Sequence, residues 1–420
     1  MALKTKKDKE KEAAAPTKER TLAQRKTALR ALMNRANTKA KHTVMAFAHD
    51  IEAPYFLRRP SGIVQLDIDT GGGVSAGGVS MLSGPDNSGK TFLMFKYFAM
   101  HQRLYGSKSF LAYAPVEGAP DYFFMKKCGI RVAIPDNMIA ERADERKLRG
   151  LPPFTKEQLA EFRDQVGEFV ILGGQTGEDL LDCVLASTKD NIFGIIGIDS
   201  FTALQPEALA ETGSLHKDPQ RAAQASLLTQ FFQKFYPFMI GLWGRNDTSL
   251  ICTQQVRSNP AKATASGPMA KYVRDWIPAG AYAAKHGKLL DLLVWSGAKE
   301  REGQTEQNKA GVVSGKWINW ETIKGKAGTH DNIRGDVEFR YDILTNDLED
   351  LVTTAIRYKA LVENDGKLSL VNQSTGEIPT QFDGIQGVNT FIEMMKADFE
   401  MELSVRREVL AAAGIECAYR

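Results

Sequence analysis

The sequence has few of the residues that build disulfide or zinc sites. Its four cysteines lie far apart without a C-x-x-C pair, and its six histidines form no H-E-x-x-H motif. These spacings exclude a zinc ribbon, a thioredoxin-type pair and a zinc-protease helix. No apolar run approaches the roughly 18 residues that a membrane helix needs, and the first residues carry no apolar signal-peptide core. We therefore expect a soluble protein of the cytoplasm.

Composition and charge indicate a globular body with a basic arm. The chain has 420 residues, 43% of them hydrophobic and 25% charged, which excludes collagen-like, wholly disordered and disulfide-scaffold proteins. Its length predicts about two or three domains. The net charge of +3 divides into +9 for residues 1–42 and −6 for the rest. Such an arm is typical of proteins that touch nucleic acid, and a solvated tail has the same charge.

The pattern of apolar residues predicts an α/β fold. Residues 1–18 are predicted to be a flexible basic lead, and 19–60 a helix with a linker, with apolar side chains near one helical face. From residue 61, short β-rich runs alternate with helix-length segments, which predicts a mostly parallel twisted sheet with helices on both faces. The runs are Val79–Leu82, Phe110–Val116, Phe169–Leu172, Ile192–Ile198, Leu250–Val256 and Leu289–Trp295.

Three segments depart from this alternation. Residues 141–165 are strongly charged and read as a surface insertion, with a capping box from Thr155 to Gln158. Residues 257–280 form a segment that is long for a loop in a compact domain, and such length is typical of a functional or a disordered segment. Residues 342–420 are predicted to form a small C-terminal α/β domain, with a hairpin across 367–382 that turns near Ser374.

The most specific motif is a phosphate-binding loop, the G-x-x-x-x-G-K-[ST] pattern. It follows the predicted strand 79–82 and opens the helix 92–99, so glycine backbone N–H groups and a helix N-terminus can hold phosphate. Lys90 is expected to reach the β and γ phosphates of ATP, and Thr91 to bind Mg²⁺. A glycine turn with an exposed lysine is the alternative. The motif comprises Gly84, Pro85, Asp86, Asn87, Ser88, Gly89, Lys90 and Thr91.

Two acids stand at the ends of predicted strands, where the carboxyl ends of parallel strands converge. Asp199 ends the strand 192–198 and is expected to hold the metal with Thr91; a helix N-cap is the alternative. Glu117 ends the strand 110–116 and is a candidate for polarising the attacking water. On position alone, a solvated glutamate at a strand end explains it nearly as well.

At this point the ordered motifs resemble a known family. The order is Ser61-Gly62 with Leu66-Asp67, then GPDNSGKT, APVEGAPD, IIGIDSFTALQP and ICTQQVR. It resembles the RecA-type homologous recombinases, including phage forms such as UvsX, over roughly residues 60–390. The resemblance implies a RecA-like ATPase core over 61–341.

Several site residues are implied by this resemblance alone. Glu117 would be the catalytic glutamate, and Asp121 and Phe124 would border the adenine. Gln255 would sense the γ-phosphate. Lys324 and Lys326 would enter the nucleotide site of the neighbouring subunit, so that ATP lies between protomers; two exposed strand lysines are the alternative.

DNA contact would fall on two loops. The first, about residues 205–220, carries His216 and Lys217, and the second is the segment 257–280. Basic side chains for phosphates and aromatic ones for stacking suit a single-strand groove; without the resemblance, a disordered loop is equally favoured. The candidates on the second loop are Arg257, Lys262, Lys271, Tyr272, Arg274 and Trp276.

These inferences lead to a hypothesis of function. The chain is expected to be a DNA-dependent ATPase that forms head-to-tail filaments on single-stranded DNA and exchanges strands with a duplex, with the helix in 19–60 docking on the next protomer. Single-strand-binding and mediator proteins are expected partners, and a virus is an expected source. The alternatives are a RecA-fold ring ATPase, either a helicase or a clock-type motor, and a DNA-binding filament scaffold with incidental turnover.

Overall fold

The computed structural model describes residues 21–41, 43–47, 57–210, 220–239, 246–264, 266, 275–278, 287–302, 311–326, 328–415 and 419. The chain falls into two units. The first comprises residues 1–55 with 242–244, and the second comprises 56–241 and 245–420. Each is described by itself. The predicted lead, residues 1–18, lies outside the described residues.

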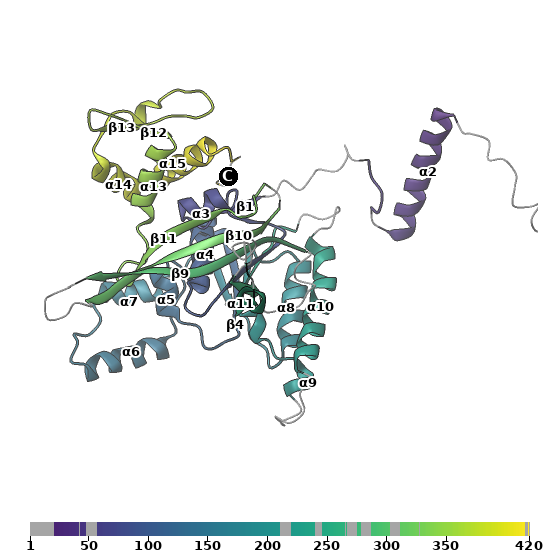
Figure 1. The fold of residues 1–420 in the computed structure, drawn as a ribbon, viewed down its shortest axis with the longest axis horizontal. Coiled ribbons are helices and arrows are strands. Elements are labelled where there is room, and N and C mark those ends of the chain that lie inside the picture. Colours follow the sequence, from purple (N-terminus) through teal and green to yellow (C-terminus); the bar gives the residue numbers. More distant parts are fainter. Residues whose placement is uncertain are drawn as a thin grey trace, which may run out of the picture. The chain divides into compact units, whose positions relative to one another are not determined.

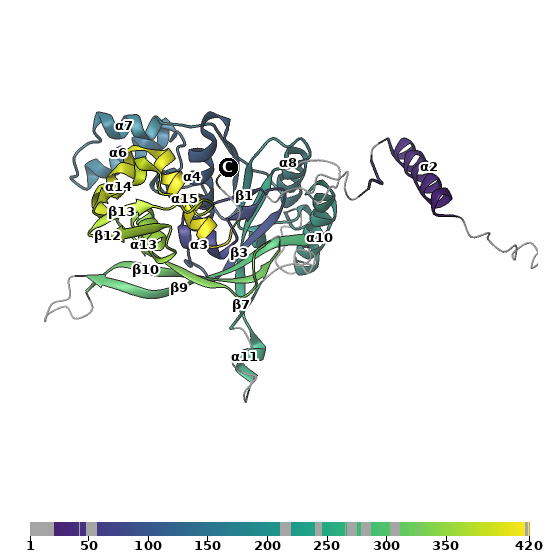
Figure 2. The same cartoon turned by 90° about the horizontal axis from the view of Figure 1, so that it is seen from above.

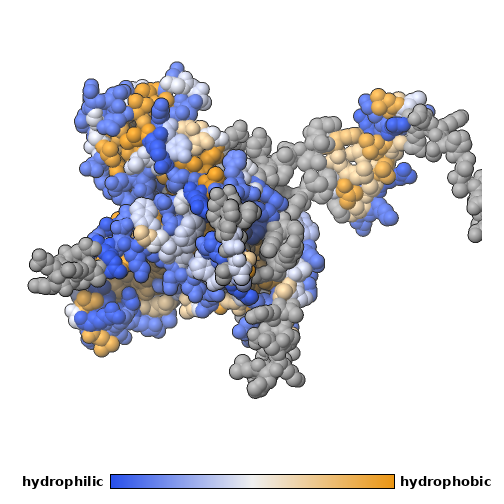
Figure 3. Space-filling model, viewed as in Figure 1, coloured by the Kyte–Doolittle hydropathy of each residue, from blue (hydrophilic) through white to orange (hydrophobic). Residues whose placement is uncertain are grey.

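The first unit is represented by one helix, α2 (Leu22–Ala40). Thr21 caps it, because its hydroxyl accepts from Gln24 N while the Gln24 side chain accepts from Thr21 N. None of its residues is buried within the chain. Leu22 is 72% exposed and Leu32 48% exposed, and Figure 3 shows this apolar surface on the helix. The predicted helix is present, and its docking role stays a prediction.

The second unit is built on a nine-stranded sheet of order β11-β10-β9-β3-β7-β6-β4-β5, with β8 paired to β7 (Figures 1 and 2). Its strands are β3 (Val79–Gly84), β4 (Phe110–Pro115), β5 (Glu168–Ile171), β6 (Ile195–Asp199), β7 (Ser249–Ser258), β8 (Trp276–Pro278), β9 (Lys288–Glu302), β10 (Val312–Gly325) and β11 (Arg334–Arg340). A separate pair is β1 (Arg58–Arg59) with β2 (Val74–Ser75).

Helices cover this sheet. They are α3 (Val64–Asp69), α4 (Lys90–Tyr105), α5 (Tyr122–Lys127), α6 (Asp136–Leu148), α7 (Lys156–Arg163), α8 (Gly177–Lys189), α9 (Glu207–Ala210), α10 (Gln220–Met239) and α11 (Pro260–Thr264). Short 3₁₀ turns are η2 (Gly106–Lys108) and η3 (Phe201–Ala203). The segment 141–165 contains most of α6 and all of α7, and its role as an insertion stays a prediction; the capping box at Thr155 is confirmed.

Alternating residues of the central strands face two different cores. Ile195 belongs to the core that includes Phe95 and Phe98 of α4, whereas Ile196 belongs to the core that includes Leu180 of α8 and Phe232 of α10. A strand covered on both faces buries every side chain, so it reads as a continuous apolar run. This packing confirms the prediction of helices on both faces.

The sheet is mixed, and the larger part of it is parallel, as predicted. Strands β9, β3, β7, β6, β4 and β5, in this order across the sheet, each run parallel to the next. Beyond β9, however, β10 and β11 run antiparallel. The reason is that β9 and β10 follow one another along the chain and pair antiparallel, and the nine residues 303–311 between them are fewer than a crossover to a parallel strand needs.

The C-terminal elements form a smaller sheet with its own core. The strands β12 (Leu361–Asn364), β13 (Lys367–Leu370) and β14 (Ile385–Gln386) pair in this order, and the helices are α13 (Asp347–Arg357), α14 (Val388–Ala397) and α15 (Phe399–Ala412), with the 3₁₀ turn η5 (Thr380–Phe382). The hairpin predicted across 367–382 corresponds in part to β13 and β14, which pair antiparallel with Lys367 opposite Gln386, and residues 373–375 form a turn between them. A tighter turn at Asp365–Gly366, between β12 and β13, is an addition to the prediction; both residues have positive φ, 51° and 73°, as a two-residue type I′ turn requires.

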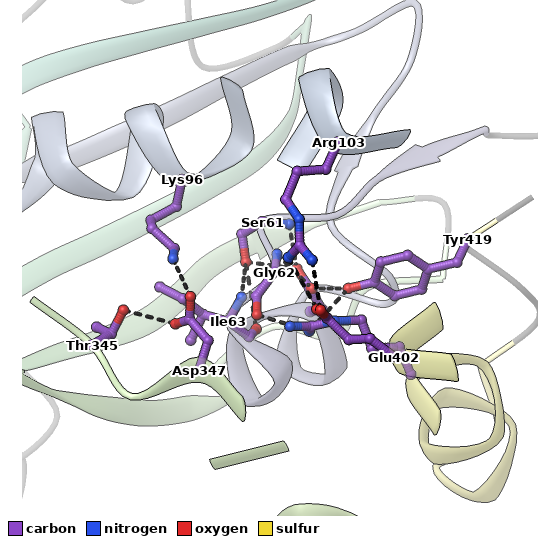
Figure 4. Close-up of polar contacts among 11 residues, drawn as sticks. Ser61, Gly62, Ile63, Lys96, Arg103, Thr345, Asp347, Glu402 and Tyr419 are labelled. Atoms are coloured by element: carbon purple, nitrogen blue, oxygen red, sulfur yellow. Dashed lines mark hydrogen bonds and ion pairs between the residues drawn. The ribbon is translucent and has the colours of Figure 1, made fainter. Parts of the chain in front are cut away.

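Polar contacts join α3 and α4 to the C-terminal elements (Figure 4). Asp67 accepts hydrogen bonds from Ser61 N, Ser61 Oγ, Gly62 N and the hydroxyl of Tyr419. On α15, Glu402 pairs with Arg103 of α4 and with Arg406. The Ser61-Gly62 and Asp67 signature is therefore part of the packing between the nine-stranded sheet with its helices and the C-terminal elements. No helix in the described ranges is long and apolar enough to cross a membrane.

Candidate nucleotide site

Four parallel strands end side by side at one edge of the sheet. β3 runs into the phosphate-binding loop, and its last residue, Gly84, lies opposite Gln255 of β7. β6 ends at Asp199, which lies opposite Pro115 of β4. Two residues beyond Pro115, Glu117 follows. The topology therefore brings the predicted phosphate, metal and water-polarising groups to one edge, where α/β sheets bind ligands.

The loop needs glycine at two positions. Gly89 has φ +100°, and a Cβ there would lie 2.7 Å from Ile318 Cδ1. A Cβ on Gly84 would lie 2.1 Å from the carbonyl oxygen of Val294. The backbone thus approaches β9 and β10 more closely than any side chain allows, and it leaves the N-terminus of α4 facing the cleft. A helix N-terminus with these backbone N–H groups favours a phosphate.

Side chains of the loop are suited to an anionic ligand. The buried hydroxyl of Ser88 has no hydrogen-bond partner among the described residues. Lys90 Nζ donates to the carbonyl oxygens of Gly84 (3.0 Å) and Pro85 (2.6 Å), within its own loop. Burial lowers the pKa of Lys90, and the charges of Asp86, Asp199 and Glu117 oppose that shift. A half-buried cation and a buried hydroxyl without a partner among the described residues fit the phosphates of a nucleotide.

Three hydroxyls surround the carboxylate of Asp199. Thr91 Oγ1 donates to Oδ2 over 2.6 Å, the Tyr113 hydroxyl lies 3.4 Å from the same oxygen, and Thr253 donates to Oδ1. Burial, and then the charge of Asp199, raise the pKa of Tyr113, so this phenol stays protonated. A hydroxyl and a carboxylate are the oxygen ligands that Mg²⁺ uses in nucleotide sites, so Thr91 and Asp199 fit the predicted metal.

These groups line one cleft of about 500 Å³. It includes most of the predicted nucleotide residues together with Glu117, Phe124, Asp199 and Gln255. Sequence reasoning missed the rest of the lining. Ser200 could have been found because it follows Asp199, but the residues of β10 and β11 carry no motif. The lining comprises Asp86, Asn87, Ser88, Gly89, Lys90, Thr91, Phe92, Glu117, Phe124, Asp199, Ser200, Gln255, Lys316, Ile318, Phe339 and Tyr341.

The β9–β10 hairpin holds the phosphate-binding loop from one side. Ser296 Oγ of β9 donates to the carbonyl oxygen of Asn87 over 2.9 Å, and Lys316 Nζ of β10 donates to the same oxygen. Asn87 has φ +56°, so these contacts stabilise a left-handed turn. Burial, and then the charge of Lys299, lower the pKa of Lys316. The cleft therefore contains a second lysine of the same chain.

Five residues predicted for nucleotide binding do not line this cleft of their own chain: Gly84 and Pro85, whose carbonyl oxygens accept from Lys90, and Asp121, Lys324 and Lys326. Asp121 is the N-cap of α5, where its carboxylate accepts from Phe124 N over 2.9 Å. Lys324 lies opposite Asp291 on β9, beside the middle of β3 and away from its loop. Burial and the charges of Lys326 and Lys288 lower the pKa of Lys324. Lys326 follows β10 and is exposed.

The predicted DNA contacts are described only in part. β7 extends past Gln255, and Arg257 lies opposite Ile277 of β8, beside Trp276. In Figure 2 this strand leaves the sheet and leads to α11. There Lys262 forms an ion pair with Asp275 at 3.3 Å. Arg257 and Trp276 are exposed. The other candidates, His216, Lys217, Lys271, Tyr272 and Arg274, lie outside the described residues.

Comparison with known proteins gives the same relationship as the ordered motifs. No family model matches the chain. It is 26% identical to Protein RecA of Leptospira meyeri over 249 residues, 59% of this chain and 53% of that protein. It is 27% identical to Protein RecA of Geobacter metallireducens over 218 residues, 52% of each. Protein RecA of Desulfotalea psychrophila is 29% identical over 200 residues, 47% of this chain and 44% of that protein.

The chain thus spans about half the length of the curated relatives it matches. At this identity the similarity supports a distant relationship to the RecA family. The mixed sheet with helices on both faces fits a RecA-like core.

Proposed function

From this distant relationship and the geometry of the cleft, we propose that the chain is an ATP-dependent DNA recombinase. It binds ATP with Mg²⁺, assembles into filaments on single-stranded DNA, and exchanges that strand with a homologous duplex in recombination and repair. Hydrolysis of ATP releases the DNA. The phage type of this family, and with it action in the cytoplasm of a host cell, are part of the proposal and rest on the motifs alone.

The observation that carries the proposal is the place of Gln255. Its side chain lines the cleft beside the phosphate-binding loop, and two residues later the same strand presents Arg257 next to Trp276. An amide that bonds a terminal phosphate loses that partner on hydrolysis. Because β7 is continuous from Gln255 to Ser258, a shift of Gln255 reaches the candidate DNA residues through a single strand.

Each catalytic role falls to a residue of known position. Lys90 neutralises the β and γ phosphates, and Thr91 with Asp199 holds the metal, which supplies further charge neutralisation when bound. Glu117 is exposed in the cleft and orients the attacking water. Neither Lys324 nor Lys326 lines the cleft of its own chain. Their proposed role is therefore in the cleft of the next protomer.

Assembly of the filament uses surfaces that the single chain leaves exposed. The apolar residues of α2 are not buried within the chain, so the helix is available to dock on a neighbouring core. A contact between two different surfaces of identical chains is head-to-tail and builds an open helix when it does not close. Single-strand-binding and mediator proteins are proposed as partners that control loading.

Strand exchange between labelled oligonucleotides tests the proposal. We expect the chain to move a fluorescent strand from a duplex to homologous single-stranded DNA, with ATP and Mg²⁺ required. The Lys90→Ala variant should lose the reaction, whereas Lys189→Ala, which removes an exposed lysine at the end of α8, should keep it. Normal ATP hydrolysis without any exchange would contradict the proposal and favour a ring motor. Strand exchange that continues through many reaction cycles without ATP hydrolysis would favour a DNA-binding filament scaffold.

A further inference from the structure

Ser200 links the metal-binding strand to Glu117. It directly follows Asp199 and is buried, with 1% of its surface exposed. Its hydroxyl donates to Oε1 of Glu117 and lies 3.1 Å from the hydroxyl of Thr202. Glu117 itself is exposed. A fixed, buried donor therefore holds one oxygen of a carboxylate that is otherwise free to adopt several rotamers.

The backbone reinforces this contact. The carbonyl oxygen of Asp199 accepts hydrogen bonds from Val116 N (2.6 Å) and from Glu117 N (3.2 Å). Glu117 is thus attached to residues 199–200 by both its main chain and its side chain. Ordering a glutamate side chain costs conformational entropy. A contact that is already made in the free protein removes that cost from the chemical step.

The segment after Ser200 is held in turn by a helix. Gln224 Nε2 of α10 donates to the carbonyl oxygens of Thr202 (2.7 Å) and Leu204 (3.1 Å). The carbonyl oxygen of Gln205 accepts from Gly177 N, the first residue of α8, over 2.7 Å. The position of Ser200 is therefore determined by the two helices that cover this face of the sheet.

We propose that Ser200 is a positioning residue for Glu117, and that Gln224 acts through it by fixing the segment 200–204. The inference rests on the proposed ATP hydrolysis and specifies how its water-orienting group is placed. Ser200 touches the side chain of Glu117, so its role is to select one orientation of that carboxylate. Gln224 has no contact with Glu117 in this arrangement, and its effect passes through the main chain of Thr202.

Replacing the hydroxyl of Ser200 tests whether this residue positions Glu117. We expect Ser200→Ala to lower kcat for ATP hydrolysis about tenfold, since a hydrogen bond to a charged group contributes roughly 1.5–3 kcal/mol and 1.4 kcal/mol is a factor of ten in rate. KM and the affinity for a fluorescent ATP analogue should stay unchanged, because Ser200 orients Glu117 and leaves the phosphate contacts intact. Ser200→Thr retains a hydroxyl and should recover most of the rate.

A double-mutant cycle tests whether Gln224 acts through Ser200. Gln224→Leu should lower kcat by a smaller factor, and the double variant Ser200→Ala/Gln224→Leu should be no slower than Ser200→Ala, because both changes act through one contact. Thr229→Ala is the matched control, since its hydroxyl donates to Ala225 within α10; it should leave kcat unchanged.

The outcomes separate this inference from the proposed function. An active wild type with an unchanged kcat in Ser200→Ala overturns the positioning role alone. Loss of nucleotide affinity in Ser200→Ala, or additive effects in the cycle, also overturns it, because either result indicates general damage to the site. A wild type that binds the analogue and hydrolyses no ATP overturns the proposed function and this inference together.

Discussion

The hydroxyl of Thr91 donates to Oδ2 of Asp199 over 2.6 Å, although the two residues are 108 positions apart in the chain. Thr91 opens α4 and Asp199 ends β6, two strands away from β3 in the sheet. The contact places the two proposed metal-binding groups together in the free protein. Binding of the ion is then expected to need little movement of the protein.

Thr253 should set the metal affinity of this pair. It donates to the other oxygen, Oδ1, and is fully buried on β7. Thr253→Val keeps the shape and removes the donor, so Asp199 is expected to lose its fixed orientation. We expect the Mg²⁺ concentration for half-maximal ATPase to rise about threefold to tenfold, with little change in kcat at saturating Mg²⁺. Thr253→Ser should behave like the wild type. An unchanged Mg²⁺ titration in Thr253→Val would contradict this role.

Lys316 should contribute to nucleotide affinity. It lines the cleft, and its ammonium holds the Asn87 carbonyl of the phosphate-binding loop. Lys316→Met removes that charge-assisted bond and is expected to weaken binding of a fluorescent ATP analogue about tenfold. The control is Lys299→Met, because Lys299 lies opposite Lys316 on β9 and is exposed. Equal affinities for the two variants would show that Lys316 has no part in the site.

The lysine pair on β10 gives a test of assembly. If Lys324 and Lys326 complete the cleft of a neighbour, Lys324→Ala/Lys326→Ala should bind nucleotide in its own cleft yet lose ATPase activity. Mixing it with an equally inactive Lys90→Ala chain should restore part of the activity, because some interfaces then combine an intact cleft with an intact lysine pair. A steady-state ATPase assay of the mixture measures this. No recovery on mixing, despite incorporation of both chains into one assembly, would argue against a shared site.

We expect Asp350 of α13 to make the free energy of unfolding depend on pH. Burial and the charges of Asp347, Glu349 and Glu338 raise its pKa to about 6. The folded state therefore holds this proton more tightly than the unfolded chain, so the group costs stability as the pH rises from about 4 through 6. Asp350→Asn should stabilise the protein by on the order of 2 kcal/mol at pH 8 and by little at pH 4.

Urea denaturation at the two pH values measures this difference. Glu363→Gln on β12 is the control, because Glu363 is exposed, and it should have little effect at either pH. The raised pKa of Asp350 would be contradicted if Asp350→Asn changed the free energy of unfolding by the same amount at pH 4 and at pH 8.

The central part of the site could be predicted because each residue has a local signal. Gly89 and Lys90 belong to a motif between a strand and a helix, while Asp199 ends an apolar run, and parallel strands bring such ends together. Gln255 is an exception, because only the family resemblance implies its role. Lys316 and Phe339 could not be predicted in the same way. They enter the cleft from antiparallel strands whose register depends on packing between distant segments.

The tight turn between β12 and β13 also has a local signal in the sequence. The dipeptide Asp365–Gly366 lies between two alternating apolar runs and is a strong signal for a two-residue turn. The predicted turn near Ser374 lies further along the chain, between β13 and β14. Ser200 is a different case. Its position after Asp199 was known, but the contact with Glu117 depends on how β4 and β6 pair.

Electron microscopy with Mg²⁺ and a slowly hydrolysed ATP analogue tests the central claim most directly, in the presence and absence of single-stranded DNA. We predict helical filaments that form only when both nucleotide and DNA are present. Closed rings, or particles that ignore DNA, would contradict the recombinase assignment and leave only a P-loop ATPase.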